Sequence, residues 1–251
     1  MNLSRTARIG ALCLLVAAPL FLAANVIIGL AWHDPPFSWA TNNISDLGNV
    51  TCGIWDTTRP RYVCSPWHGA MNASMLLTAA LLAIGMIFTW RVPGRGFAVR
   101  AARALLLLAA MGYALAGAFP ADVDENLHFL GAILIMGMGN IGLLVAGLAP
   151  RRTALGRTRA FTRSMVLIAV AGSVLFFTQQ GLGIGVGGME RVAAFPTPVW
   201  ACCIGAVLLA ADPRGRAVSV ARRINDDAVA AHNSPELVGE PDDRQGRRSV
   251  R

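Results

Sequence analysis

The chain has 251 residues, a formal net charge of +8 and a mean hydropathy of +0.52. Hydrophobic residues make up 55% of it and charged residues only 14%, whereas an average soluble domain has about 45–50% apolar and about 25% charged residues. This combination argues against a soluble globular domain, a disordered chain and a nucleic-acid-binding domain. All 22 basic residues are arginine, a bias that indicates a GC-rich bacterial source rather than a function.

Six segments are long and apolar enough to cross a bilayer, which takes about 20 residues of helix. In chain order they are residues 9–32, 69–90, 101–119, 127–148, 165–180 and 191–210. The first is longer than the apolar run of a signal peptide, about 7–15 residues, so we interpret it as a retained helix. The sixth has Pro196 and Pro198 near its start, where a first turn or a kink tolerates proline. The sequence therefore predicts an all-α, polytopic membrane protein built as a six-helix bundle.

Arginines are concentrated in alternate connections between these segments. The connections rich in arginine contain Arg5, Arg8, Arg91, Arg95, Arg100, Arg103, Arg151, Arg152, Arg157, Arg159, Arg163, Arg214, Arg216, Arg222 and Arg223. The other connections contain three arginines and seven acidic residues. Because cytoplasmic loops carry an excess of basic residues, we expect both termini in the cytoplasm and a multi-pass protein of the plasma membrane. The arginines then border the membrane surface, so the expected partners are membrane lipids and not nucleic acid.

The chain divides into two predicted parts. Residues 1–211 form the transmembrane domain, whose first outer loop spans residues 33–68, and residues 212–251 form a cytoplasmic, largely disordered tail. The glycine run at residues 181–188 lacks the strand that precedes a phosphate-binding fingerprint, so we interpret it as a flexible, non-helical outer loop. Asn25 and Asn140 lie deep within their segments, where we expect their amides to bond across helices.

The five cysteines fall into two groups. Cys13, Cys202 and Cys203 lie within spans, where a thiol behaves as a small hydrophobic group. Cys52 and Cys64 share the first outer loop, where an oxidising exterior permits a disulfide. Closing a loop of about a dozen residues stabilises it by about 3 kcal/mol in the chain-entropy model. We therefore predict a Cys52–Cys64 disulfide, with two free thiols as the alternative.

Ionisable side chains at the outer ends of the predicted helices are the main candidates for a functional site, because such groups are costly in or near a bilayer. Asp46 lies in the first outer loop, Asp122 follows the third segment, His128 opens the fourth, and Glu190 with Arg191 opens the sixth. Each also has a structural interpretation. The aspartates could cap helices, His128 could be an interfacial imidazole with one hydrogen bond, and Glu190 and Arg191 could pair with other outer charges.

Three short segments resemble a known family. They are Asn43–Gly48, Gly117–Asp122 with His128 after it, and Gly188–Arg191, and Asn72 near the start of the second helix fits the same pattern. Together they resemble the motifs of the six-helix bacterial membrane family catalogued as domain of unknown function 998. The resemblance covers about residues 9–210. It implies a six-helix bundle whose signature polar residues gather on the extracytoplasmic side, and it implies no established reaction. The first outer loop is longer than the family leads us to expect.

The first functional hypothesis is an intramembrane enzyme that acts on a lipid or isoprenoid-like substrate at the outer leaflet. Carboxylates beside a histidine can perform acid–base work when burial brings their pKa values toward neutrality. The expected catalytic residues are Asp46, Asp122, His128 and Glu190. The expected substrate-binding residues are Arg191, which would hold an anionic head group, with Asn72, Ser45 and His68.

Other hypotheses remain open at this point. No cofactor is predicted, but neutral imidazoles suit zinc, and His33, His68 and His128 all fall on the outer side without a diagnostic spacing. The second hypothesis is a non-catalytic protein that binds a lipid or small molecule, or a structural membrane subunit in which the same polar groups fix helix register. The third is a transporter, although the sequence shows neither a midplane charge nor a pair of broken helices. The oligomeric state does not follow from one sequence.

Overall fold

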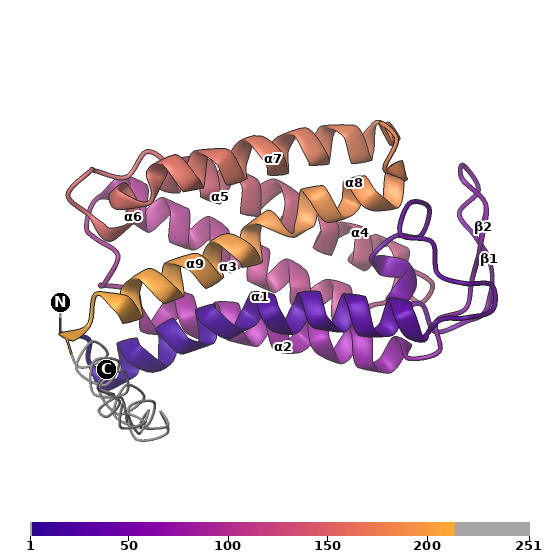
Figure 1. Ribbon diagram of the computed structural model, residues 1–251, viewed down its shortest axis with the longest axis horizontal. Coiled ribbons are helices and arrows are strands. Elements are labelled where there is room, and N and C mark those ends of the chain that lie inside the picture. The colour runs from indigo at the N-terminus through magenta and orange to yellow at the C-terminus, as the bar shows by residue number, and fades with distance from the viewer. Residues whose placement is uncertain (1, 214–251) are drawn as a thin grey trace, which may run out of the picture.

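The structure, a computed structural model, describes residues 2–213. Its longer helices are α1 (Arg5–Ala31), α2 (His68–Phe88), α3 (Phe97–Ala118), α4 (Glu125–Ile133), α5 (Gly139–Ala146), α7 (Arg159–Phe177), α8 (Gly185–Ala194) and α9 (Pro196–Ala210) (Figure 1). The shorter elements are the 3₁₀ helix η1 (Ser45–Gly48), the strands β1 (Gly53–Trp55) and β2 (Arg61–Val63), the π-helical segment η2 (Leu134–Met138) and the helix α6 (Ala154–Arg157). Six helical stretches of the described chain are long and apolar enough to span a membrane, which confirms the predicted fold class.

Several helix boundaries differ from the expected ones. The first span begins at Arg5 because the hydroxyl of Ser4 accepts a hydrogen bond from the N–H of Ala7 (3.1 Å) and caps the helix. The fifth span begins at Arg159 and ends at Phe177. The interpretation of the glycine run as wholly non-helical was wrong, because α8 begins at Gly185. The predicted tail lies outside the described residues, apart from residues 212 and 213.

Two of the spans are interrupted. The fourth passes from α4 through the π-helical η2 into α5. The sixth, Gly185–Ala210, consists of α8 and α9 joined at Phe195. Pro196 opens α9, and a proline has no backbone N–H to continue the helical ladder, which accounts for the break. The sequence analysis allowed a first turn or a kink at these prolines, and the structure has the first turn of α9 there.

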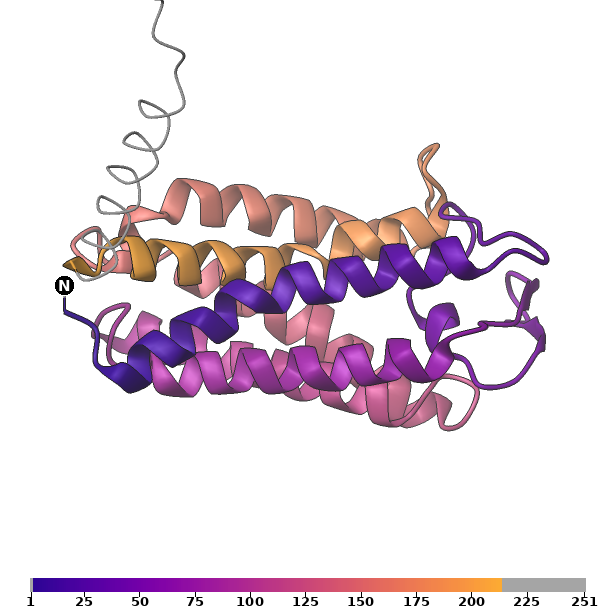
Figure 2. The same cartoon turned by 60° about the horizontal axis from the view of Figure 1, so that its bottom comes forward.

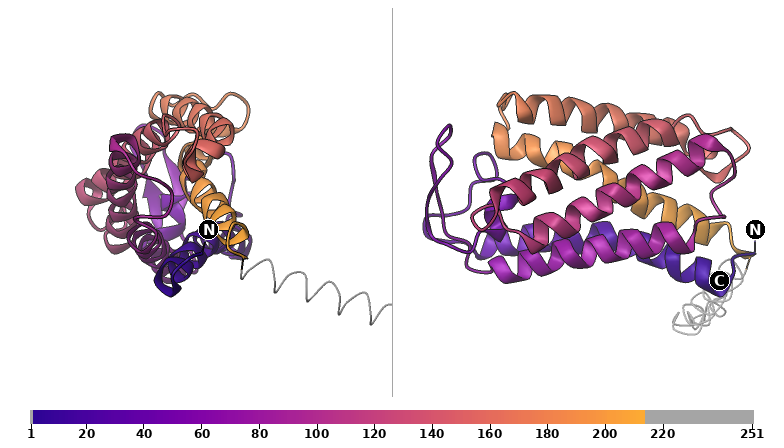
Figure 3. Two further views of the ribbon diagram at one scale, coloured as in Figure 1. Left: turned by 90° about the vertical axis from the view of Figure 1, so that its left-hand side faces the viewer. Right: turned by 180° about the vertical axis from the view of Figure 1, so that it is seen from behind.

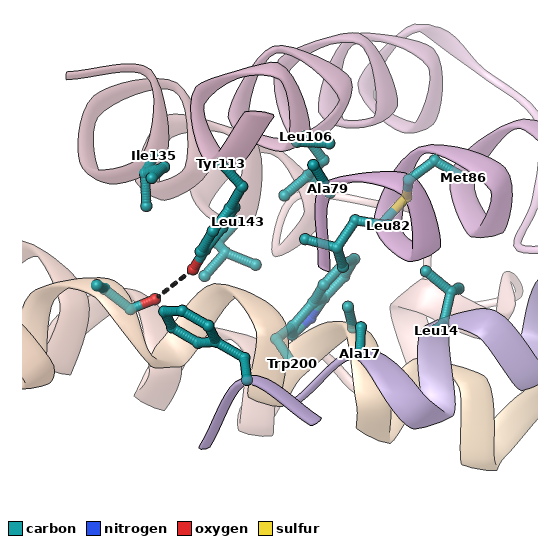
Figure 4. Packing of buried hydrophobic residues seen from close by; sticks show 14 of the residues in the cluster. Leu14, Ala17, Ala79, Leu82, Met86, Leu106, Tyr113, Ile135, Leu143 and Trp200 are labelled. Atoms are coloured by element: carbon teal, nitrogen blue, oxygen red, sulfur yellow. Dashed lines mark hydrogen bonds between the residues drawn. The ribbon is translucent and has the colours of Figure 1, made fainter. Parts of the chain in front are cut away.

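The helices pack through small residues and a core of large apolar side chains. α1 lies between α2 and α9, and α7 packs on α8 (Figure 2). A Cβ on Gly205 of α9 would come within 2.5 Å of the carbonyl oxygen of Ala11 and 2.7 Å of the nitrogen of Leu15, so these two backbones approach closely. Tyr113 and Trp200 are fully buried between the helices (Figure 4), with the Tyr113 hydroxyl donating to the carbonyl of Ala194 at 3.2 Å.

Two asparagines within the spans behave differently. The Nδ2 of Asn140 donates to the hydroxyl of Ser173 on α7 at 2.9 Å, which confirms a bond across helices. The Nδ2 of Asn25 instead donates to the carbonyl of Phe21 in its own helix at 2.9 Å, so the expected cross-helix bond was wrong there. Elsewhere the outer surfaces of the helices expose large apolar residues such as Leu30 and Leu167, at 63% and 72%, as expected for side chains that face lipid.

The two ends of the bundle carry different structures (Figures 1 and 3). At one end lie the start of α1 and the end of α9. At the other end, here called the hairpin end, lie η1, the β1–β2 hairpin and the starts of α2, α4 and α8. Residues 32–67, which connect α1 to α2 and are called the cap loop below, contain both η1 and the hairpin. The cap loop therefore covers one end of the bundle.

Candidate functional site

A cavity of about 480 Å³ lies at the hairpin end, between the cap loop and the ends of α4, α7 and α8. One part of its wall is polar and comes from the cap loop, from α8 and from the first turn of α4. Another part is apolar and comes from α4 and the last turn of α7. The lining residues are Asn43, Ser45, Ile54, Trp55, Asp56, Thr57, Arg59, Arg61, Ala121, Glu125, His128, Phe129, Ala132, Phe176, Phe177, Gln179 and Glu190.

Asp46 lies behind this wall, in η1, and is fully buried. Its carboxylate accepts two hydrogen bonds from the guanidinium of Arg61, from Nε and Nη2, each at 2.6 Å. The same carboxylate accepts bonds from Asn42 (3.1 Å) and from the N–H of Asn43 (2.9 Å). A buried carboxylate requires such partners, so Asp46 fixes the cap loop internally, and two of its partners, Asn43 and Arg61, line the cavity.

The hairpin adds a second carboxylate to this ion pair. Arg61 Nη1 donates to Asp56 at 3.1 Å. Burial by itself would raise the pKa of Asp56, but donors from Thr58, Arg59 and Arg61 outweigh it and lower the pKa to about 2. Burial would likewise lower the pKa of Arg61, and its bonds to Asp46 and Asp56 raise it instead. Arg61 is therefore a charged link between η1 and the hairpin.

Asp122 joins the cap loop to the connection between α3 and α4. Its Oδ2 accepts hydrogen bonds from the N–H of Val50 (2.8 Å) and from the N–H and hydroxyl of Thr51 (both 2.7 Å). Burial opposes the charged form, but these donors outweigh it and hold the pKa of Asp122 below its usual value. The helix cap considered for Asp122 belongs to Asp124, whose Oδ1 accepts from the N–H of Leu127 at 3.0 Å. Asp122 does not line the cavity.

Asn72 and His68 contact the cap loop from the start of α2. The Nδ2 of Asn72 donates to the carbonyl of Gly48 at 2.9 Å. A Cβ on Gly48 would collide with the Asn72 amide oxygen, so a larger residue there requires the Asn72 side chain to move. The Nδ1 of His68 lies 3.3 Å from the carbonyl of Ser65. Neither Asn72 nor His68 lines the cavity, whereas Ser45, also predicted to bind substrate, does.

Glu190 and Arg191, adjacent in α8, face different surroundings. Glu190 is buried and lines the cavity, and its Oε2 accepts from the N–H of Ile44 at 2.5 Å. Arg191 lies outside the cavity lining and donates through Nη1 to the carbonyls of Asn42 (2.9 Å) and Gly187 (2.7 Å). Its guanidinium also lies over the ring of Trp39, 5.2 Å from the centroid. Arg191 thus binds the cap loop to α8, while its Nε and Nη2 are buried without a hydrogen-bond partner among the described residues, and its contact with a head group stays a prediction.

His128 lines the cavity from α4, together with Glu190 and Ser45. Its Nδ1 lies 3.0 Å from the carbonyl of Phe119, and an imidazole nitrogen next to a carbonyl carries the proton. In the neutral ring Nε2 is then the acceptor. His33 lies in the cap loop and is exposed. Within residues 2–213 no group of three or more His, Cys, Asp and Glu side chains could hold a metal ion.

The cysteine prediction is confirmed, since Cys52 and Cys64 form a disulfide. These residues flank the two strands, in which Gly53 pairs with Val63 and Trp55 pairs with Arg61. The disulfide therefore closes the hairpin that carries Asp56 and Arg61. Within the described residues, Cys13, Cys202 and Cys203 have free thiols.

The structure brings together part of the predicted site and adds residues that the sequence reasoning missed. His128, Glu190 and Ser45 share the cavity, while Asp46, Asp122, Asn72, His68 and Arg191 hold the cap loop in place. The missed lining residues are Asp56, Arg59, Arg61, Glu125, Trp55, Phe129, Phe176, Phe177 and Gln179. Arg59 and Arg61 had a signal in the sequence, because they are arginines in connections dominated by acidic residues.

The fold and the position of this site are those of a multi-pass helical membrane protein with polar groups collected at one end of the bundle. A family model described as "Protein of unknown function (DUF998)" matches residues 15–211. The chain therefore belongs to this family, which confirms the resemblance noted in its motifs. No match was found among curated proteins or among solved structures.

Proposed function

We propose that this protein binds an amphipathic, lipid-like molecule in the cavity at the hairpin end and that Glu190 and His128 act on it by acid–base chemistry. The observation that carries the proposal is the composition of the cavity wall. Glu190, His128 and Ser45 lie on its polar part, and Phe129, Phe176 and Phe177 lie on its apolar part. Phe129 and Phe177 are also 54% and 45% exposed, on helices that span the membrane. Such a wall suits a molecule with a polar head and an apolar chain.

The acid–base roles follow from the free positions on the two side chains. Glu190 uses Oε2 for the N–H of Ile44, which leaves Oε1 to exchange a proton with a substrate. His128 uses Nδ1 for the carbonyl of Phe119, which leaves Nε2. A carboxyl group and an imidazole in one cavity can accept a proton from a substrate and return it at another atom.

We place the hairpin end on the outer side of the plasma membrane, because the exposed arginines gather at the opposite end. Arg91, Arg95, Arg151 and Arg152 are all exposed there. The test uses single cysteines at Asp124 and at Thr153 in a chain whose Cys13, Cys202 and Cys203 are replaced by alanine. A membrane-impermeant thiol reagent should label intact cells at position 124 and not at position 153. Equal labelling of both positions would reject this orientation.

The chemical proposal is tested with variants that keep the local hydrogen bonds. Glu190→Gln retains an acceptor for the N–H of Ile44, and His128→Gln retains a donor for the carbonyl of Phe119. Both proteins should accumulate to wild-type levels and fail to restore the lipid profile of a deletion strain, as read by lipid mass spectrometry. Asp34→Asn and His33→Gln change exposed residues of the cap loop and serve as matched controls that should restore it.

A second candidate function is ligand binding or a structural role without chemistry. It is favoured by the contacts of Asp46, Asp122, Asn72 and Arg191, all of which hold the cap loop in place. In that case Glu190→Gln and His128→Gln should restore the lipid profile whenever they accumulate normally. If both variants restore the lipid profile, the enzyme hypothesis is excluded and the binding or structural role is supported.

A further inference from the structure

In the polar part of the cavity wall, the donors have protein partners more often than the acceptors do. The main donors are two arginines, Arg59 and Arg61. Arg61 donates to Asp46 through Nε and Nη2 and to Asp56 through Nη1. Arg59 donates through Nη2 to the Asn43 side chain at 2.7 Å and through Nη1 to the carbonyl of Thr41. The Nε of Arg59 is buried without a hydrogen-bond partner among the described residues, so a ligand in the cavity does not reach it. Both guanidinium groups are therefore committed to the cap loop.

The hydrogen-bond acceptors in the same part of the wall have fewer protein partners. Oε1 of Glu190 receives no hydrogen bond from residues 2–213 and is not among the enclosed, unpartnered atoms. Glu125 is exposed at the first turn of α4 and also borders the cavity. The Nε2 of neutral His128 is a further acceptor. A ligand that reaches this wall therefore meets acceptors that lack donors.

The charge of the wall points in the same direction. Three carboxylates line the cavity, from Asp56, Glu125 and Glu190, against two arginines. A fourth carboxylate, Asp46, lies directly behind Arg61 at 2.6 Å. Arg191 lies behind the wall as well, next to Glu190, so four carboxylates stand against three arginines and the acidic groups are in excess by one when all are ionised. Such a site repels a phosphate or carboxylate head group and attracts a cation.

The apolar part of the wall shows where a chain would leave the cavity. Phe129 of α4 and Phe177 of α7 meet edge to face, with ring centroids 6.4 Å apart. Below them α7 packs on α5, and at the hairpin end it packs on α8 rather than on α4. The two rings therefore stand between the cavity and the lipid-facing surface. Both rings line the cavity and are partly exposed, so an alkyl chain that lies along them would remain in apolar surroundings.

From these observations we infer that the ligand of this cavity is an amine-bearing lipid. Its ammonium group donates to Glu190 and to neighbouring acceptors, and its chain passes Phe129 and Phe177. This inference rests on the proposed binding of an amphipathic molecule and specifies the head group. It differs from the expectation of an anionic head group held by Arg191, which lies outside the cavity lining.

The test compares three probes that share a dodecyl chain and differ in the head group: dodecylamine, dodecanol and dodecyl phosphate. Each is titrated into phosphatidylcholine nanodiscs that contain the full chain, and occupancy is read by native mass spectrometry. Empty nanodiscs correct for partition into lipid. The wild type should bind the amine most tightly and the phosphate least. Glu190→Gln should weaken amine binding by about tenfold, as expected for the loss of a charge-assisted hydrogen bond, and should not weaken phosphate binding.

Two further variants separate the head group from the chain. Phe129→Ala should weaken the binding of all three probes by a similar factor, because it removes apolar contact area and no charge. Asp34→Asn, which changes an exposed carboxylate of the cap loop outside the cavity lining, should change none of them. If dodecyl phosphate binds more tightly than dodecylamine and Arg59→Gln abolishes that binding, the inferred head group is wrong although the cavity still binds lipid. If the wild type binds none of the three probes, the proposed function itself fails.

Discussion

At the hairpin end of the bundle, Asp46, Arg61 and Asp122 are bonded to one another or to the backbone of the cap loop. At the opposite end, arginines such as Arg91 and Arg152 are exposed. An exception there is Arg103, which is buried, donates to the carbonyl of Thr89 at 2.6 Å and lies over the ring of Trp90. The comparison teaches that charged side chains have two different roles. Exposed charges, which water solvates, influence the orientation of the protein in the membrane. Buried charges need protein partners in place of water, and those bonds fix the local structure.

The largest loss of stability is expected when the buried Asp46–Arg61 ion pair at the hairpin end is broken. Asp46→Leu leaves Arg61 without its main partner in a site where the Arg61 side chain is only 8% exposed. Breaking a buried pair on one side costs about 3–5 kcal/mol, and we expect a corresponding fall in the midpoint of thermal unfolding. The double variant Asp46→Leu with Arg61→Met should recover part of the loss, because no uncompensated charge remains. Equal stability of Asp46→Leu and an exposed control, Asp34→Leu, would show that the pair does not hold the cap loop.

The disulfide provides the second test, because it belongs to the hairpin end alone. The bond closes a loop with a sequence separation of 12, and its removal in Cys52→Ser with Cys64→Ser should cost about 3 kcal/mol. We expect faster proteolysis within the cap loop and unchanged protection of the helices. Reductant added to the wild type should reproduce the effect, while Cys202→Ala should not. An unaltered rate of loop cleavage would mean that the polar contacts suffice to hold the hairpin.

A pH titration sharpens the comparison at Asp122. Because its pKa is lowered from the usual 3.8 in the folded protein, its contribution to stability is complete above that value. The contribution is lost as the pH falls through the lower folded value. Asp122→Asn should therefore be less stable than the wild type at pH 7, and the difference should shrink below pH 3.8. Thermal midpoints of both proteins measured across this range provide the check. A difference that grows on acidification would contradict the assigned hydrogen bonds.

The smallest expected effect lies within the bundle, away from both ends. Asn140→Ala removes the bond to Ser173, and polar contacts between transmembrane helices contribute about 0.6 kcal/mol on average. A double-mutant cycle with Ser173→Ala measures the coupling directly. The expected loss is smaller than that for Asp46 or Asp122. A coupling energy larger than that of the Asp46–Arg61 pair would show that polar contacts inside the bundle contribute more to stability than those at the hairpin end.

Much of the fold was predictable because membrane spans are encoded locally. The apolar runs predict six spans close to their observed positions, although the ends shifted, as at Ser4, where a cap extends the first helix, and two of the spans are interrupted. The site was predictable only in part. His128 and Glu190 share a cavity as expected, but Asp122 instead holds the loop at Val50 and Thr51. Sequence reasoning could place these residues at one end but could not determine which backbone groups each would meet.

The sequence by itself determined that the chain is a six-span membrane protein and that the acidic residues of its spans and loops gather at one end, because hydropathy and charge act residue by residue. Only the tertiary structure decided which of those residues face a common cavity, since that depends on how the cap loop folds back over α4, α7 and α8. Arg61 illustrates the difference. In sequence it is one arginine among several, and in the folded chain it connects Asp46 to Asp56 because a β-hairpin brings it there.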